Sequence, residues 1–209
     1  MQQQITENAA GPNGADLRAR NTFRHELYYS LMTAGIGLAI GAAATWAVRE
    51  GLMPFAGFTT DLKTFAIEVV VYVVLFDFYF YGLHRALHIK WLYQNVHVVH
   101  HRSLPPTLLT ALAFHPAEST AILAFIPITM CLIPIHLVSL VVVSLFLSGS
   151  ILVAHCGYEV FPRWMAKVPL LNWYVTPRVH DEHHKRRDCN YSATLSIFDR
   201  TFRTFRNVD

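Results

Sequence analysis

The chain has 209 residues, of which 53% are hydrophobic and 15% charged, and its formal net charge is +3. This composition is more apolar than that of a soluble domain and predicts one membrane module with a polar cap. The basic residues do not alternate with aromatic ones along a polar groove, which argues against nucleic acid as a partner. The three cysteines, Cys131, Cys156 and Cys189, form no CxxC pair and favour a reducing compartment.

Residues 1–24 are expected to form a flexible tail, because the first 20 or so are rich in Gln, Asn, Gly and Ala and lack apolar periodicity. No apolar stretch follows the first residue closely enough for a signal peptide. Residues 27–48 carry no charge and are long enough to cross a bilayer. After a loop over 49–61, a second apolar run follows, so we place the first two transmembrane helices within 25–83.

A transmembrane hairpin is predicted over 108–154, because no Asp, Glu, Lys or Arg occurs between Glu118 and Glu159. Its turn is expected near Pro134, and its first arm, 119–134, could instead re-enter the membrane. The sequence therefore predicts an all-α integral membrane protein with about four transmembrane helices. Two histidine-rich segments, 84–107 and 155–209, would form a helical cap.

The basic residues are distributed unevenly between the predicted loops. Only Arg49 and Lys63 lie between the first two spans, so the other 15 of the 17 share one side. By the positive-inside rule that side is cytoplasmic, in a bacterial inner membrane or, in a eukaryote, the endoplasmic reticulum. An even number of spans places every histidine cluster on this face.

Eight of the 12 histidines lie in three clusters with chelating spacing. HRALH places two imidazoles four residues apart on one helix face, whereas HVVHH and HDEHH can each offer two imidazoles to one ion and a third to its neighbour. Eight imidazoles exceed the needs of one ion, so two metals are expected, and imidazole suits iron, zinc and copper. The clustered residues are His84, His88, His97, His100, His101, His180, His183 and His184.

Other histidines and acids near the clusters have less specific patterns. His25 and His136 are expected to be ordinary hydrogen-bonding residues. Asp77 lies two helical turns before His84, so it either orients a ligand histidine or is an interfacial charge. A metalloprotease is disfavoured, because HRALH lacks the glutamate of HExxH and HDEHH does not match the inverted motif.

The residues around the clusters form longer motifs: DFYFYGLHRALH, TALAFHPAE, and VTPRVHDEHH followed by NYSATLSIFDR. Over about residues 77–205 they resemble the fatty acid hydroxylase or sterol desaturase superfamily of integral membrane di-iron enzymes, and in particular its bacterial sterol desaturase-like members. The chain departs from the usual motifs at five positions. Trp, Arg, Gly, Trp and Gly are usual at Gly82, Ala113, Ser192, Phe198 and Arg203, respectively.

This resemblance implies an O₂-dependent oxidoreductase that hydroxylates or desaturates an unactivated C–H bond of a lipid, such as a sterol or fatty acyl chain. It implies two iron ions, for which zinc could substitute in a purified protein, held in a catalytic module over 77–205. The eight clustered histidines and His155 would be the ligands. Behind them we expect Asp77, His115, Glu118 and Asn190, although His115 could simply begin a helix.

The electrons would come from an external ferredoxin- or cytochrome-type donor, because the chain has no dinucleotide fingerprint, cysteine cluster or haem-binding domain. The basic run 185–187 could steer such a donor or hold anionic lipid headgroups. Residues 197–205 are expected to form an interfacial helix. Two alternatives remain open: a membrane zinc hydrolase of lipid amides or esters, and a non-enzymatic metal-handling protein.

Overall fold

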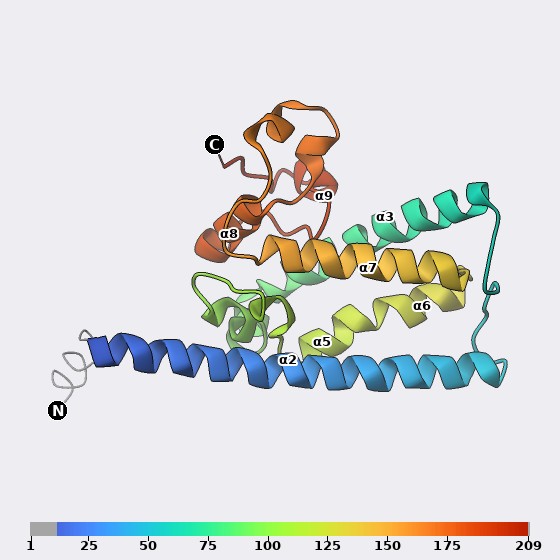
Figure 1. Cartoon of the computed structure of the whole chain (residues 1–209), viewed down its shortest axis with the longest axis horizontal. Helices are drawn as coiled ribbons and strands as arrows, with labels where there is room; N and C mark the ends of the chain where they lie inside the picture. Colours follow the sequence, from blue (N-terminus) through green and yellow to red (C-terminus); the bar gives the residue numbers. More distant parts are fainter. Residues whose placement is uncertain (1–11, 209) are drawn as a thin grey trace.

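The computed structural model describes residues 12–208, with the side chains of residues 19–208, as a bundle of helices capped at one end (Figure 1). Three helices are long and apolar enough to cross a membrane. They are α2 (Pro12–Arg49), α3 (Leu62–Leu87) and α7 (Leu137–Ala154). Within the described residues the only β pairings are two isolated bridges. The predicted all-α integral membrane fold is confirmed.

The helix α2 begins well before the predicted first span. Residues 12–24, which we expected in a flexible tail, continue the helix instead. Pro12 stands at the first helical position, which suits proline, and good helix formers such as Ala, Leu and Arg follow it. Residues 1–11 of the expected tail lie outside the described part of the chain.

The third predicted span is a broken helix made of α5 (Pro116–Leu123) and α6 (Phe125–Leu132). Pro127 explains the break, because it lacks an N–H and its ring clashes with the carbonyl of Leu123 four residues earlier. The two pieces follow one another along α2 toward the end of the bundle remote from α8, and α7 returns beside them (Figure 1). Residues 133–136 form the predicted turn of the hairpin.

One stripe of α3 forms the centre of the packed bundle. Tyr72, Phe76 and Phe80 recur every four residues, are buried, and pack around Phe125 of α6 and the buried face of α7. His84 is the next residue on this stripe. The packing that buries α3 therefore also directs His84 toward the interior at the end of the helix.

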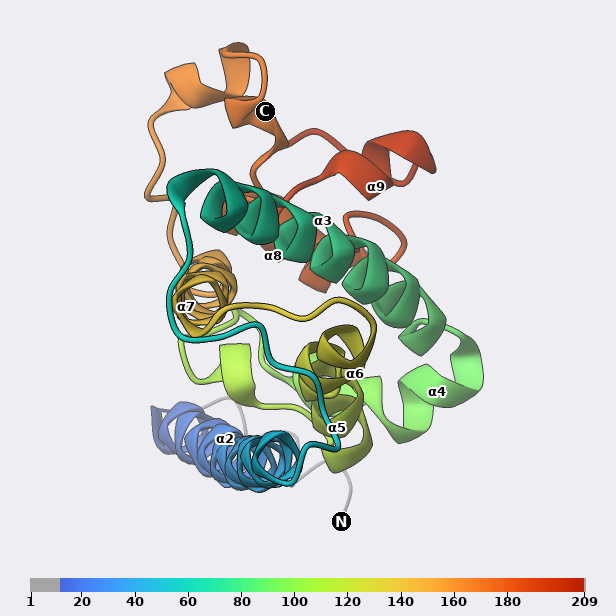
Figure 2. The ribbon, with the colours of Figure 1, turned by 90° about the vertical axis from the view of Figure 1, so that its right-hand side faces the viewer.

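Short elements close this end of the bundle, with α4 and α9 on the outer side of α3 (Figure 2). They are α4 (Lys90–Asn95), η1 (His97–Arg102), η2 (Thr110–Leu112), η3 (Arg163–Lys167), η4 (Leu171–Trp173), α8 (Pro177–Arg186) and α9 (Ile197–Thr201). The expected interfacial helix over 197–205 is shorter than predicted. Phe198 and Phe202 pack against Tyr81 of α3, which ties α9 to the bundle.

Candidate metal centre

Nine buried or half-buried histidines converge where α3, η1, α7 and α8 meet, and they fall into two groups. In each group the ligand atoms all lie within 4.8 Å of one another. The first histidine group is His84, His88, His97, His101 and His183, and the second is His100, His155, His180 and His184. All clusters therefore share one end of the bundle, as predicted.

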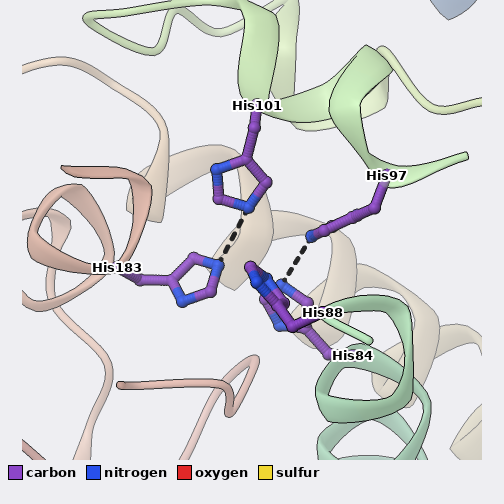
Figure 3. Close-up of side chains that lie close together, drawn as sticks. All are labelled: His84, His88, His97, His101 and His183. Atoms are coloured by element: carbon purple, nitrogen blue, oxygen red, sulfur yellow. Dashed lines mark hydrogen bonds between the residues drawn. The ribbon is translucent and has the colours of Figure 1, made fainter. Parts of the chain in front are cut away.

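In the first histidine group the rings point toward a common centre (Figure 3). The Nε2 atoms of His84 and His97 are 3.1 Å apart, and those of His101 and His183 are also 3.1 Å apart. Two nitrogens that lie about 2.1 Å from one ion, at octahedral or tetrahedral angles, are about 3.0 to 3.4 Å apart. The spacing thus fits ligands of a shared ion.

The second histidine group has the same spacing. His155 Nε2 lies 2.9 Å from His180 Nε2 and 3.3 Å from His100 Nε2. His180 and His184 are 3.1 Å apart at Nε2. His155, which follows the last residue of α7, is central to this group although it belongs to no sequence cluster.

The opposite ring nitrogens fix the protonation of several of these imidazoles. His84 Nδ1 lies 2.7 Å from the Tyr191 carbonyl, His183 Nδ1 lies 2.7 Å from the Cys189 carbonyl, and His155 Nδ1 lies 2.8 Å from the Ile151 carbonyl. A carbonyl only accepts, so each Nδ1 must carry the hydrogen and each Nε2 presents a lone pair. Lone pairs that face one another at this distance call for a cation between them.

Burial keeps these side chains uncharged. Outside the membrane-spanning helices it lowers the pKa of His88 to about 2, of His97 to about 3 and of His155 to about 4. They are therefore neutral at pH 7, which is the form that binds metals. The buried Nε2 of His88 has no hydrogen-bond partner, as expected for a nitrogen that binds a metal ion.

The sequence spacing explains how the two groups are divided. His97 and His101 of HVVHH belong to the first group and His100 to the second. In HDEHH the pair four residues apart, His180 and His184, belongs to the second group and the remaining histidine to the first. HVVHH and HDEHH thus each serve both groups, as their spacing predicts, and this holds the groups side by side, whereas both histidines of HRALH belong to the first group.

Of the four residues expected behind the ligands, Glu118 is the one that is hydrogen-bonded to a histidine of the two groups. Its Oε1 accepts a 2.7 Å hydrogen bond from Nδ1 of His97, and both side chains are buried. Asn190 lies one step further away, donating to the carbonyl of Val179 beside His180. His115 caps α5 through a 3.2 Å bond from the Ala117 N–H, which is its helix-starting role.

Asp77 fits neither of its two interpretations. It accepts hydrogen bonds from the Thr194 N–H (2.9 Å), the Thr194 hydroxyl (2.6 Å) and the Leu195 N–H (2.9 Å). It is buried and contacts no ligand histidine through these bonds. Its effect on the site is indirect, because it fastens the segment that carries the Tyr191 carbonyl onto α3.

Sequence reasoning missed several partners of the ligands. Carbonyl acceptors such as those of Tyr191 and Cys189 have no side-chain pattern, although Tyr191 lies in the NYSATL motif and Cys189 directly precedes it. The ring of Tyr93 lies 5.6 Å from both the His88 and His101 rings, between centroids. No spacing in the sequence pointed to this aromatic neighbour.

The basic run 185–187 is exposed, and each of its cations has a neighbour. Lys185 pairs with Asp181 at 2.5 Å and Arg186 with Glu182 at 3.6 Å, both one helical turn away. The guanidinium of Arg187 lies 5.2 Å from the centre of the Tyr93 ring. The two histidines expected to be ordinary are so: His25 bonds to the Val99 carbonyl and His136 to Glu68.

A small, partly open cavity adjoins both histidine groups. Its apolar wall comes from Phe80 of α3, Phe114, Ile122 of α5 and Ile151 of α7, and its other wall from ligand histidines and Glu118. An apolar lining that ends at a cluster of candidate metal ligands suits the approach of a hydrocarbon group.

Comparisons with known proteins agree with this geometry. The family model described as "Fatty acid hydroxylase" matches residues 69–204. The chain is 37% identical over 146 residues to methylsterol monooxygenase 2-2 of Arabidopsis thaliana, which covers 68% of this chain and 53% of that protein. It is 40% identical over 141 residues to the very-long-chain aldehyde decarbonylase GL1-8 of Oryza sativa subsp. indica, covering 66% and 51%. The chain thus spans about half the length of these relatives, and no solved structure matches it significantly.

Proposed function

The chain belongs to the fatty acid hydroxylase family, and we propose that it is a membrane-bound di-iron oxidoreductase that uses O₂ to hydroxylate or desaturate a lipid. The observation that carries this proposal is the pair of adjacent histidine groups, with facing Nε2 lone pairs, beside an apolar cavity.

Iron suits these donors. Groups of five and four imidazoles exceed the three protein ligands of a typical catalytic zinc, and they fit metals that accept higher coordination numbers. When bound, the two irons would supply the reduction of O₂ and the oxidising power needed to remove hydrogen from an unactivated C–H bond. We propose the first and second histidine groups as their ligands.

The other residues orient and enclose this site. Glu118 and the Tyr191, Cys189 and Ile151 carbonyls hold the ligand rings in the tautomer that presents Nε2. Phe80, Phe114 and Ile122 line the space where the target carbon would lie and exclude water from it. The protein's contribution would thus be to position the target carbon and to exclude water.

The substrate we propose is a lipid such as a sterol or a fatty acyl chain. The names of the relatives refer to a methylsterol and a very-long-chain aldehyde, which are both apolar molecules. We further propose that the histidine groups face the cytoplasm, as the uneven distribution of basic residues indicates, and that a separate ferredoxin- or cytochrome-type protein delivers the electrons.

A zinc hydrolase is less well supported. Such an enzyme needs a carboxylate or histidine free to move the proton of a zinc-bound water. In the described residues Glu118 is the one acidic side chain bonded to these histidines. Its Oε1 is engaged by His97 and its Oε2 has no hydrogen-bond partner, so the hydrolase is disfavoured instead by the number of imidazoles in each group.

The proposal is tested by comparing the lipids of cells with and without this protein. A lipid that gains one oxygen atom, or loses two hydrogen atoms, only in cells with the protein supports the proposal and names the reaction. A lipid ester or amide that is cleaved instead would support the hydrolase.

A further inference from the structure

A buried carboxylate that the proposed chemistry does not use lies on α2, outside the residues that the family model matches. Glu26 is 2% exposed. Its two oxygens bind different partners: Oε1 accepts from the Thr110 hydroxyl at 2.8 Å, and Oε2 accepts from the Thr107 hydroxyl at 2.9 Å. A buried carboxylate needs such donors, because it loses its hydration.

The threonine hydroxyls explain why a carboxylate stands there. The Thr110 hydroxyl already accepts from the Thr107 N–H at 2.8 Å, and the Thr107 hydroxyl accepts from the Leu109 N–H at 3.2 Å. Their protons are therefore free to point at Glu26, and two donated protons need two acceptor oxygens. An amide at this position would offer one oxygen and set its NH₂ group against the other hydroxyl.

Glu26 belongs to a polar stripe on α2, which we call the α2 clamp: His25, Glu26, Ser30 and Thr33. Its other members bond to the Val99 carbonyl at 3.0 Å, to the Leu109 carbonyl at 2.9 Å and to the Ser119 hydroxyl at 2.7 Å. These contacts fasten to α2 the chain between η1 and α5. The two helices that flank this segment carry residues of the candidate metal centre: His100 in η1 and Glu118 in α5.

A short path leads from Glu26 to a ligand. Thr110 lies four residues before Phe114, whose ring stacks on that of His100 with centroids 4.7 Å apart and planes inclined by 21°. We propose that Glu26 is a positioning residue for the second histidine group: by holding Thr110, it keeps Phe114 against His100 and so directs Nε2 of His100 toward His155. This inference rests on the proposed metal function.

The test measures metal release, not turnover. The full chain in detergent is loaded with Fe²⁺ without oxygen, and an iron chelator is added while release is followed by absorbance. In Glu26→Gln, one iron per chain should leave about 10-fold faster than in the wild type. This is the low end of the roughly 10- to 100-fold loss of affinity found for residues bonded directly to a ligand, because Glu26 acts through Thr110 and Phe114. The other iron should leave at the wild-type rate. Glu50→Gln, the same change at the exposed end of α2, should release both irons at the wild-type rate.

Thr110 supplies a second pair of variants in case Glu26→Gln does not fold. Thr110→Ser keeps the hydroxyl and should behave as the wild type, whereas Thr110→Val should release one iron faster. Unchanged release in both Glu26→Gln and Thr110→Val overturns the inference, as does equal acceleration for both irons, which indicates general loosening. A wild-type chain that takes up no iron would overturn the proposed function itself, and this inference with it.

Discussion

Glu118 Oε1 lies 2.7 Å from Nδ1 of His97, and both side chains are at most 2% exposed. The carboxylate is 21 residues away in sequence and on a different helix, yet it is the only acidic side chain bonded to a ligand in the described residues. It fixes the His97 tautomer and makes Nε2 more basic.

Replacing Glu118 with Gln should weaken the metal centre without removing a ligand. The amide oxygen can still accept from Nδ1, but the charge that raises the basicity of the imidazole is lost. We expect metal affinity to fall about 10- to 100-fold, measured by competition with a chelator. Glu50→Gln is the control, and equal affinities in the two variants would contradict the role assigned to Glu118.

Removing one ligand from each group should separate the two metal sites. We expect His183→Ala to weaken the first site and His100→Ala the second, so that each variant retains about one iron per chain in elemental analysis. His115→Ala is the matched control, because His115 caps α5 and lies in neither group. It should retain both irons and lose about 1 kcal/mol of stability at most. Two irons in His183→Ala or His100→Ala would show that the ligand set is wrong.

Acid should destabilise the metal-free protein. The folded-state pKa values of His97, about 3, and His155, about 4, lie below the unfolded value of 6.5. Above pH 6.5 both histidines are neutral in the folded and the unfolded chain, so their contribution to stability is fully present. As the pH falls from 6.5 toward the folded-state values, only the unfolded chain binds the protons, and the free energy of unfolding decreases by about 1.4 kcal/mol per pH unit for each such histidine. Thermal unfolding at pH 7 and pH 5 measures this effect. An unfolding temperature independent of pH over this range would show that the imidazoles are not buried.

The backbone at Arg203 makes a separate prediction about stability. This residue adopts φ of 59°, a left-handed conformation that favours glycine, and glycine is usual there in the motif that the chain resembles. Arg203→Gly should therefore stabilise the protein by up to about 1 kcal/mol, seen as a higher unfolding temperature. Arg203→Ala removes the same charge but keeps the Cβ, so it should give no gain. A gain of similar size in both variants would attribute the effect to the charge instead.

Patterns local in sequence predicted much of the fold and site. Histidines four residues apart share a group in both HVVHH and HDEHH. In HDEHH this follows because residues four apart lie on one face of the α-helix α8. HVVHH forms the 3-10 helix η1, so the α-helical spacing rule does not explain its grouping. Apolar runs located α2, α3 and α7, because a membrane span is one continuous segment of the sequence. Of the other motif departures, Gly82 is exposed and Phe198 packs on Phe78.

Contacts between distant segments were harder to predict. Asp77 binds the backbone of Thr194, more than a hundred residues later, and Glu26 binds Thr107 and Thr110. Neither the backbone acceptors of the histidine rings nor these carboxylate contacts leave a periodic pattern in the sequence, because each depends on how the helices pack. Pro127 indicated an interruption in the third span. The lengths of the two helical pieces also depend on where the first piece begins, which the proline does not determine.

The most direct test of the account is to purify the full chain with its metals and to measure iron per chain together with lipid oxidation in the presence and absence of O₂. We predict two irons per chain and a lipid product, gaining one oxygen or losing two hydrogens, that forms only when both O₂ and a reductant are supplied. Full turnover without O₂, or with zinc as the only metal present, would contradict it.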